Sequence, residues 1–391
     1  MLPQAQTLFP YTRALRRDFH QHPELGFQEV RTAGIVAREL RQLGLEVSTG
    51  IGKTGVVALL EGEQPGATLL LRFDMDALPI VEATGAPYAS TAHGVMHACG
   101  HDGHTAIGLT VARLLHAHRA ELRGTVKLVF QPAEEGLGGA EAMLADGVLL
   151  NPRPDATLAL HLWNSYPVGW LGIAAGPVMA ASETFRVRLQ GRGGHGALPN
   201  LAIDPVFAAA QIVSALQSVV ARNVSPMETA VLSVTALRAG ETFNVIPDTA
   251  ELQGTIRTFD AAVRALVLRR FEEIVRGVAG ALGCEATIEF VEVTPAVVNH
   301  PQVTESVQQT AARLFPQANL QTKYATMGSE DMAFMQQEIP GCYFFVGSAN
   351  PEAGLNAAHH HPKFDFDEVV LPQAAALMAS AALDWLRANV V

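Results

Sequence analysis

The fold is most constrained by the alternation of short apolar runs with helical segments over the first third of the chain. Apolar runs of strand length, rich in leucine and β-branched residues, occur at residues 54–62, 67–75 and 124–132. A helical segment at 105–122 separates the last two runs. Continuous apolar strands that alternate with helices are typical of a parallel sheet covered on both faces. The pattern therefore predicts a layered α/β domain with a central, mostly parallel sheet.

The middle of the chain has a different pattern. Alternating, half-exposed strands are predicted at 183–191, 229–240, 248–259 and 285–293, and helices at 206–220 and 261–283. The resulting order, β-α-β-β-α-β, is the ferredoxin-like arrangement. We therefore place an inserted α+β domain at 182–294 and expect residues 1–181 and 295–391 to form the larger α/β domain.

Composition excludes several classes of partner. The net charge is −11 and the arginines are scattered, whereas nucleic-acid binding needs a concentrated basic surface. No apolar run approaches the roughly 18 residues of a membrane helix, and the first residues lack the pattern of a secretory signal. The cysteines, Cys99, Cys284 and Cys342, lie far apart and do not resemble a disulfide framework. We expect a cytoplasmic protein with no nucleic-acid and no membrane partner.

The segment MHACGHDGHT, residues 96–105, concentrates groups that can carry chemistry. One interpretation is a metal site that uses the thiolate and the imidazoles. The other is a cysteine hydrolase in which Cys99 is the nucleophile and His101 or His97 is the base. Residues two apart on a turn are poorly placed as an attacking pair, which favours the metal interpretation.

Other segments offer further ligands near predicted strand ends. Glu134 and Glu135 follow one strand in QPAEEG, His161 follows the run ATLAL, and AAHHHPKF contains His359, His360 and His361. Adjacent carboxylates are costly unless a cation or a proton offsets them, and one can bind a metal while its neighbour handles protons. Thiolate, imidazole and carboxylate together are typical of a transition-metal site, and five such ligands suffice for two ions.

The motifs MHACGHDGHT, QPAEEG, HLWNSYPVG, GRGGHGALP, FNVIPD, GSEDM and HHPKFDFDE, in this order, resemble the M20 metallopeptidase family, in particular its amidohydrolase branch of hippurate hydrolases, aminoacylases and auxin-conjugate hydrolases. The resemblance implies a zinc-peptidase-like catalytic domain with an inserted ferredoxin-like lid. It also implies metal ligands at Cys99, His101, Glu135, His161 and His360, with Cys99 as the bridge. Glu134 takes the role of general base, and His359 is the alternative to His360.

The resemblance implies further roles. His195 in the lid would stabilise the oxyanion in the partner subunit's site, so a homodimer through the lid is expected. Asn244 and Arg257 would bind the substrate carboxylate, although Arg257 could equally be an exposed strand residue. Arg72 stands where many M20 peptidases have a ligand histidine. Asp74 or Asp76 would then accept a hydrogen bond from a ligand imidazole, unless these aspartates only cap a turn.

These features predict a metal-dependent amidohydrolase that cleaves the amide bond of N-acyl-L-amino acids with two divalent ions, zinc, manganese or cobalt. A dinuclear dipeptidase or carboxypeptidase of the same family is the alternative. A non-catalytic metal-binding scaffold is disfavoured because Glu134 is present.

Overall fold

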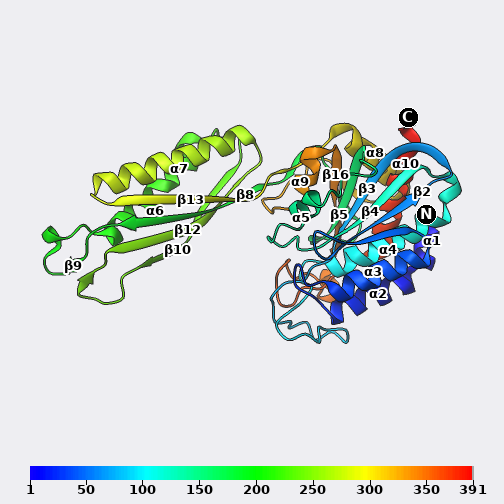
Figure 1. The fold of residues 1–391 in the computed structure, drawn as a ribbon, viewed down its shortest axis with the longest axis horizontal. Coiled ribbons are helices and arrows are strands. Elements are labelled where there is room, and N and C mark those ends of the chain that lie inside the picture. Colours follow the sequence, from blue (N-terminus) through cyan, green and yellow to red (C-terminus); the bar gives the residue numbers. More distant parts are fainter. Residues whose placement is uncertain (390–391) are drawn as a thin grey trace. The chain divides into compact units, whose positions relative to one another are not determined.

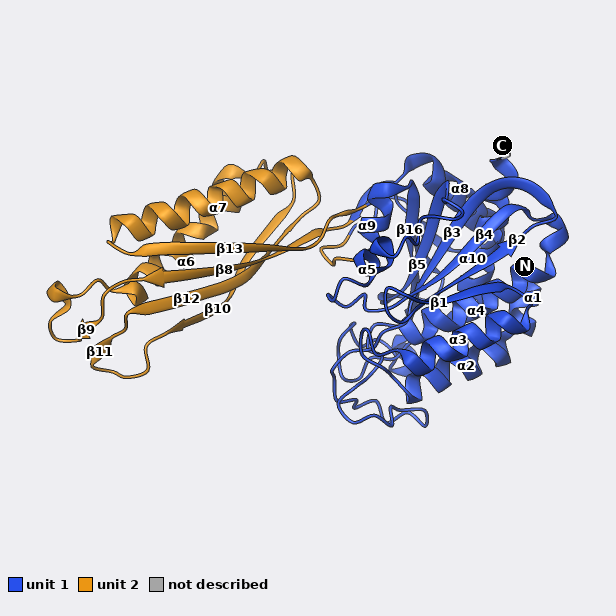
Figure 2. Ribbon diagram, in the orientation of Figure 1, with its two compact units in different colours: residues 1–178, 298–325, 331–391 blue, residues 179–297, 326–330 orange. Residues whose placement is uncertain are grey.

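The computed structural model describes residues 1–389, which divide into two compact units (Figure 2). Unit 1 contains residues 1–178, 298–325 and the chain from 331 onward, and unit 2 contains residues 179–297 and 326–330. Unit 2 thus begins three residues before the predicted insert, 182–294, and its main segment ends three residues after it. It also takes in a short return segment that the sequence did not indicate.

Unit 1 is built on a mixed sheet (Figure 1). The strand order is β1 (Glu46–Ile51), β2 (Gly55–Glu61), β4 (Arg123–Gln131), β3 (Gln64–Asp74), β5 (Ala156–Pro167), β16 (Gly341–Ala349), β6 (Trp170–Gly172) and β15 (Asn319–Gln321). The central pairs, β4 with β3, β3 with β5 and β5 with β16, are parallel. β2 runs antiparallel to β1 and β4, and β6 runs antiparallel to β16. The prediction of an α/β domain with a mostly parallel central sheet is confirmed.

Helices surround this sheet. They are α1 (Leu2–Thr7), α2 (Phe9–Gln21), α3 (Val30–Gln42), α4 (His101–Ala117), α5 (Gly139–Ala145), α8 (Pro301–Leu314), α9 (Met332–Glu338) and α10 (Val370–Ala388). α4 and α10 contact each other and the same central strands. Gly108 of α4 allows this close packing, because a Cβ atom there would lie 2.7 Å from the rings of Phe73 and Phe130.

The parallel strands bring chemically active residues to one edge of the sheet. β3 ends at Asp74 and β4 ends at Gln131, so the segments around Asp76 and Glu134 leave the sheet at neighbouring positions. His161 differs from the prediction, because β5 does not end there. Its pairing with β16 continues to Pro167, so His161 projects from within a strand and is held by the sheet itself.

Unit 2 has the predicted ferredoxin-like order. β8 (Ala181–Gln190), α6 (Pro205–Asn223), β10 (Ala230–Ala239), β12 (Thr249–Thr258), α7 (Ala261–Ala281) and β13 (Glu285–Thr294) follow one another, and the antiparallel sheet has the order β10-β12-β8-β13. Asp204 and Asp260 cap the two helices by accepting backbone N–H bonds from their first turns. A second pairing, β9 (Gly194–His195) with β11 (Val245–Ile246), joins two loops of this unit.

The apolar faces of the two helices form the core of unit 2. Ala208, Ile212 and Leu216 of α6 and Phe271 of α7 are buried with Phe185 of β8. α6 is also the one helix among residues 1–389 that is long and apolar enough to span a membrane by length and composition. Its buried residues pack against the sheet of unit 2, and 33% of its apolar stretch is buried.

Candidate metal centre

The five predicted metal ligands converge in unit 1 as two groups that share Cys99. Cys99, His101 and His161 form one group, and Cys99, Glu135 and His360 form the other. Within each group the potential ligand atoms all lie within 4.8 Å of one another. A shared thiolate between two ligand groups is the arrangement that a bridging ligand in a dinuclear site requires.

His101 is oriented for metal binding by its neighbour Asp76. Nδ1 of His101 lies 3.0 Å from the backbone oxygen of Asp76 and 3.3 Å from its carboxylate Oδ1. Nε2 is buried, has no hydrogen-bond partner among residues 1–389 and lies 3.8 Å from Oδ2 of Asp74. An unsatisfied buried imidazole nitrogen is costly, and a cation would satisfy it. His101 begins α4 directly after Gly100, whose φ of 96° only glycine adopts readily.

His161 is oriented in the same manner by the backbone. Its Nδ1 donates to the carbonyl oxygen of Leu162 at 2.7 Å, so Nε2 carries the lone pair and lies 3.4 Å from Sγ of Cys99. Burial and the neighbouring imidazoles of His104 and His359 hold the pKa of His161 well below its ordinary value. His161 is thus a neutral imidazole, the form that binds metals.

His360 and Glu135 complete the second group. Nε2 of His360 lies 3.2 Å from Oε1 of Glu135. The backbone of His360 is left-handed, with φ of 64°, and its N–H donates to the carbonyl oxygen of Ala98 at 2.7 Å. Contacts with Cys99 and Glu135 raise the pKa of His360 to about 10. The side chains of Cys99 and Glu135 therefore favour a positive charge next to them, so these residues fit divalent cations.

His359 points elsewhere. Its Nε2 lies 3.0 Å from the carbonyl oxygen of Leu162, and its ring stacks on Trp163 with a centroid distance of 4.7 Å. Burial lowers the pKa of His359 to about 4. This geometry favours His360 over His359 as the ligand.

Glu134 stands next to the ligands. Its carboxylate forms a group with Nε2 or Nδ1 of His101 and the carboxylate of Glu135, again within 4.8 Å, and its side chain is nearly buried. Glu135 belongs to the ligand group with Cys99, whereas Glu134 does not. This arrangement is compatible with the predicted role of Glu134 in proton transfer.

The two aspartates have different contacts. Asp76 orients His101 and also accepts the N–H of Glu135 at 3.0 Å. Asp74 instead accepts a hydrogen bond of 2.6 Å from Nδ1 of His104. Burial would raise the pKa of Asp74, but His101, His104 and Arg72 together hold it well below its usual range.

His104 is a residue that sequence reasoning did not select. Its Nε2 accepts the N–H of Leu162 at 2.9 Å, so both ring nitrogens are engaged and His104 supports the site without binding an ion. Its spacing of three residues from His101 on a helix places both on one face and was the available signal.

The surroundings of Cys99 bear on the alternative interpretation as a cysteine hydrolase. Its Sγ lies 3.4 Å from Nε2 of His161 and also interacts with His101 and His360, whereas neither nitrogen of the buried His97 has a hydrogen-bond partner within the described chain. Burial and then the charge of Glu135 raise the pKa of the Cys99 thiol. These surroundings oppose a free thiolate nucleophile with His97 as its base.

The remaining predicted residues belong to unit 2. His195 is exposed on β9, opposite Val245 of β11, and the carbonyl oxygen of Asn244 accepts the N–H of Gly196 at 2.8 Å. Nδ1 of His195 accepts the N–H of Ala197 at 3.0 Å, which leaves Nε2–H as a donor when the imidazole is neutral. His195 and Asn244 thus lie together at one end of the unit.

Arg257 does not lie with them. Asn244 belongs to the loop before β12, whereas Arg257 is near the far end of β12, opposite Ser182. Arg257 is eight residue steps along this strand from Thr249, which corresponds to roughly 26 Å. One unit 2 therefore cannot place Asn244 and Arg257 on the same small substrate.

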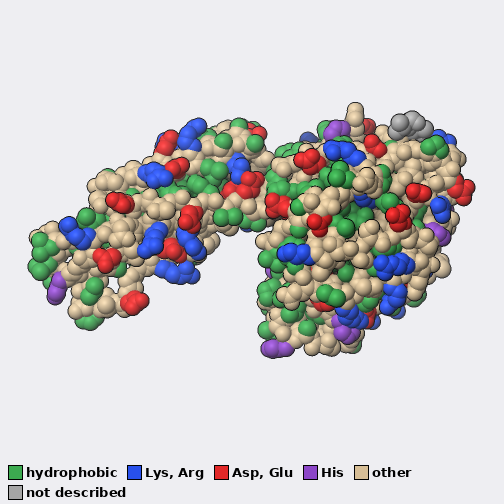
Figure 3. All heavy atoms as spheres, viewed as in Figure 1, with side chains coloured by type: hydrophobic (Ala, Val, Ile, Leu, Met, Phe, Trp, Pro, Cys, Tyr) green, Lys and Arg blue, Asp and Glu red, His purple; other side chains and the backbone are tan. Residues whose placement is uncertain are grey.

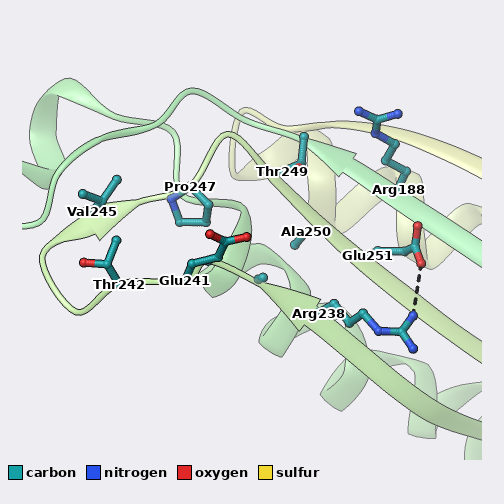
Figure 4. A pocket seen from close by; sticks show the side chains of 11 residues that line it. Arg188, Arg238, Glu241, Thr242, Val245, Pro247, Thr249, Ala250 and Glu251 are labelled. Atoms are coloured by element: carbon teal, nitrogen blue, oxygen red, sulfur yellow. Dashed lines mark ion pairs between the residues drawn. The ribbon is translucent and has the colours of Figure 1, made fainter.

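A hollow of about 650 Å³ lies on unit 2, on the side of the sheet where Arg188 and Arg238 project (Figure 4). Arg238 and Glu251 form an ion pair across it, with 3.6 Å between Nη1 and Oε1. None of the predicted site residues lines this hollow. The predicted metal ligands all belong to unit 1.

Comparison with known proteins supports the same chemistry. The model of peptidase family M20/M25/M40 matches residues 70–384. The chain is 42% identical to an N-acetylcysteine deacetylase of Bacillus subtilis, in an alignment that covers 94% of this chain and 95% of the relative. It is 37% identical to the hippurate hydrolase of Campylobacter jejuni, in an alignment that covers 99% of this chain and 100% of the relative. The fold matches the crystal structure of Bacillus subtilis YXEP, described as a dinuclear metal binding peptidase of the M20 family, with a TM-score of 0.86, 37% identity, and coverage of 98% and 99%.

Proposed function

The chain belongs to peptidase family M20/M25/M40, and from this membership we propose that it is a metal-dependent amidohydrolase that cleaves N-acyl-L-amino acids. The observation that carries the proposal is the pair of ligand groups joined by Cys99, with the carboxylate of Glu134 beside them. The deacetylase and the hippurate hydrolase that it resembles are named for acyl amino acid substrates.

Two divalent ions would be held by Cys99, His101 and His161 on one side and by Cys99, Glu135 and His360 on the other. Zinc, manganese and cobalt all suit this mixture of thiolate, imidazole and carboxylate. Such ions, when bound, lower the pKa of a water molecule and polarise the substrate carbonyl.

Glu134 is the proton carrier in this proposal. As a carboxylate it accepts a proton from the attacking water, and as a carboxylic acid it returns the proton to the departing nitrogen. The C–N bond breaks as the nitrogen is protonated, so the products are a carboxylic acid and a free amino acid. The position of Glu134, which is grouped with His101 and Glu135 but belongs to neither group that contains Cys99, supports this division of roles.

We further propose that the enzyme is a homodimer assembled through unit 2. Exposed apolar side chains surround His195 and the neighbouring loop, namely Leu198, Leu201, Phe243 and Val245. Such a surface favours burial against a partner. Because one unit 2 cannot present both Asn244 and Arg257 to one small substrate, we assign the contacts of His195 and Asn244 to the partner subunit's substrate.

The charge distribution and the unpaired cysteines support two further expectations, namely that the protein has no nucleic-acid partner and that it is cytoplasmic. The visible face of the molecule mixes acidic and basic side chains and has no continuous basic area (Figure 3), and the net charge is −11. This distribution opposes a nucleic-acid partner. The three cysteines are unpaired, which supports a reducing, cytoplasmic location.

The variant Glu134→Gln tests the proposal. It keeps the size of the side chain and removes the proton acceptor, so hydrolysis of N-acetyl-L-cysteine and of hippurate should fall by about 10²- to 10⁴-fold with the metal content unchanged. Glu141→Gln, the same change on an exposed helix residue, is the control and should retain full activity. Near-normal hydrolysis by a metal-loaded Glu134→Gln enzyme would show that the base is wrongly assigned.

A further inference from the structure

Glu29 is a fully buried carboxylate that the reaction described above does not use. It occupies the N-cap position of α3, yet its side chain makes no capping hydrogen bond with that helix. Its carboxylate instead accepts the backbone N–H of Ala133 at 2.9 Å and the hydroxyl of Thr54 at 2.5 Å. A buried carboxylate thus forms a hydrogen bond with the backbone of the residue that precedes Glu134.

Ala133 has an unusual backbone conformation. Its φ is 54°, in the left-handed region that disfavours residues with a Cβ atom. Gly26 packs against it so closely that a Cβ on Gly26 would lie 3.0 Å from Cα of Ala133. The carbonyl oxygen of Ala133 also accepts the N–H of Gly139 at 3.1 Å. Strained non-glycine residues persist where surrounding contacts hold them, and such residues cluster at active sites.

A second carboxylate holds the other side of Glu134. Oδ2 of Asp76 accepts the N–H of Glu135 at 3.0 Å. Glu29 thus holds the peptide between Pro132 and Ala133, one residue before the Ala133–Glu134 peptide, and Asp76 holds the peptide between Glu134 and Glu135. Asp76 also orients His101, whereas Glu29 has no direct contact with a predicted metal ligand in the hydrogen bonds described for it.

We propose that Glu29 is a positioning residue for the general base: its hydrogen bond to Ala133 N–H holds the left-handed turn that directs the carboxylate of Glu134 toward the reacting water. This inference rests on the role of Glu134 in the proposed function. This positioning role depends on the hydrogen bond to Ala133 and not on the negative charge of Glu29. Because Asp76 separately holds Glu135, loss of Glu29 should disturb the base more than the ligand.

The variants Glu29→Ala, Glu29→Gln and Ala133→Gly test this role in the full-length, metal-loaded enzyme with N-acetyl-L-cysteine and hippurate as probes. A misplacement of about 1 Å can cost about 100-fold in rate, so Glu29→Ala should lower kcat by about 10- to 100-fold. KM and the number of bound ions should stay unchanged. Glu29→Gln keeps an oxygen acceptor and should remain within about threefold of the native kcat.

The double variant Glu29→Ala with Ala133→Gly is the decisive measurement. Glycine adopts positive φ without the steric cost of a Cβ, so the turn no longer needs the carboxylate, and about tenfold of the lost kcat should return. Asn151 also has positive φ, at 50°, but lies outside the site. Adding Asn151→Gly to Glu29→Ala is the matched control and should restore nothing.

Each outcome decides the inference. Equal loss in Glu29→Gln and Glu29→Ala, or no recovery with Ala133→Gly, would overturn it, as would equal recovery with Asn151→Gly. If Glu29→Ala does not fold, Glu29→Asp, whose shorter side chain cannot span both Thr54 and Ala133, carries the same comparison. An inactive Glu134→Gln enzyme beside a fully active Glu29→Ala enzyme would reject this inference alone. An active Glu134→Gln enzyme would reject the proposed function first.

Discussion

Asp74 accepts a hydrogen bond of 2.6 Å from Nδ1 of His104, and this pair connects the end of β3 to the segment of β5 that carries the predicted ligand His161. The opposite nitrogen of His104 accepts the N–H of Leu162, and the carbonyl oxygen of Leu162 accepts Nδ1–H of His161. Arg72 also pairs with Asp74, at 2.5 Å. The orientation of His161 therefore depends on groups that do not bind an ion themselves.

Replacing His104 by phenylalanine should weaken metal binding selectively. The ring volume is kept, but Leu162 loses an acceptor and Asp74 a donor, so His161 loses its support. We expect the affinity of the group that contains His161 to fall by about 10- to 100-fold, with the other ion less affected. Titration with a competing chelator measures this difference. His116→Phe, on the last turn of the same helix, is the control, and equal affinities in both variants would contradict the role of His104.

His360 and His359 should behave differently when each is changed to alanine. Nε2 of His360 lies beside Glu135, whereas Nε2 of His359 bonds to the Leu162 carbonyl. His360→Ala should lose one of two bound ions and nearly all hydrolysis, and His359→Ala should retain both ions. Elemental analysis of the two variants after metal loading measures this. The reverse result would make His359 the ligand.

The stability of the metal-free protein should fall as the pH rises through the titration of His20. Burial and the charge of Arg16 lower the pKa of His20, but hydrogen bonds to Asp102 and Glu82 outweigh them, and the net pKa lies above 6.5. The folded state then binds more protons than the unfolded state. The stabilisation is complete below pH 6.5 and is lost as the pH rises through the higher folded value. Urea unfolding of chelated protein across this range, with His20→Gln as the comparison, should show a decline that the variant lacks. Parallel pH profiles would contradict it.

His195 should act in the partner's site. A mixture of His195→Ala and Glu134→Gln subunits forms heterodimers in which one site has both native residues. After subunit exchange at equal concentrations, about a quarter of the native activity should appear, because half of the dimers are mixed and each has one intact site. Neither variant alone should reach this level. No recovery, with exchange verified by mass, would place His195 in its own subunit or outside the reaction.

The sequence predicted the helices and strands in which apolar residues recur at a regular spacing. The continuous apolar strands of unit 1 and the alternating strands of unit 2 define their sheets, since side-chain burial alone sets both patterns. The ligand segments were recognised because Cys99, Glu135 and His360 belong to motifs. The end of β5 was misplaced because its pairing with β16 beyond His161 depends on a strand that lies far along the chain, where Ala349 pairs with Pro167.

Contacts between residues far apart in the chain produce no periodic pattern in the sequence, so they could not be predicted from it. Arg16, fully buried, pairs with Asp102 at 2.8 Å and with Asp365 at 2.7 Å, and so joins α2 to the segments that carry His101 and His360. The left-handed conformations of Ala133 and His360 were also hidden, because neither residue is the glycine that normally marks positive φ. Their backbone is set by hydrogen bonds from elsewhere in the fold, such as that of Glu29.

The shared position of Cys99 in both ligand groups is the central claim, and counting bound ions in Cys99→Ala tests it most directly. The native protein, saturated with zinc, manganese or cobalt and then freed of excess metal, should retain two ions per chain by elemental analysis. Cys99→Ala should lose affinity for both ions, whereas Cys342→Ala, a change at a buried cysteine of β16, should keep two. Two tightly held ions in Cys99→Ala, or a native protein that is fully active after complete removal of metal, would contradict the account.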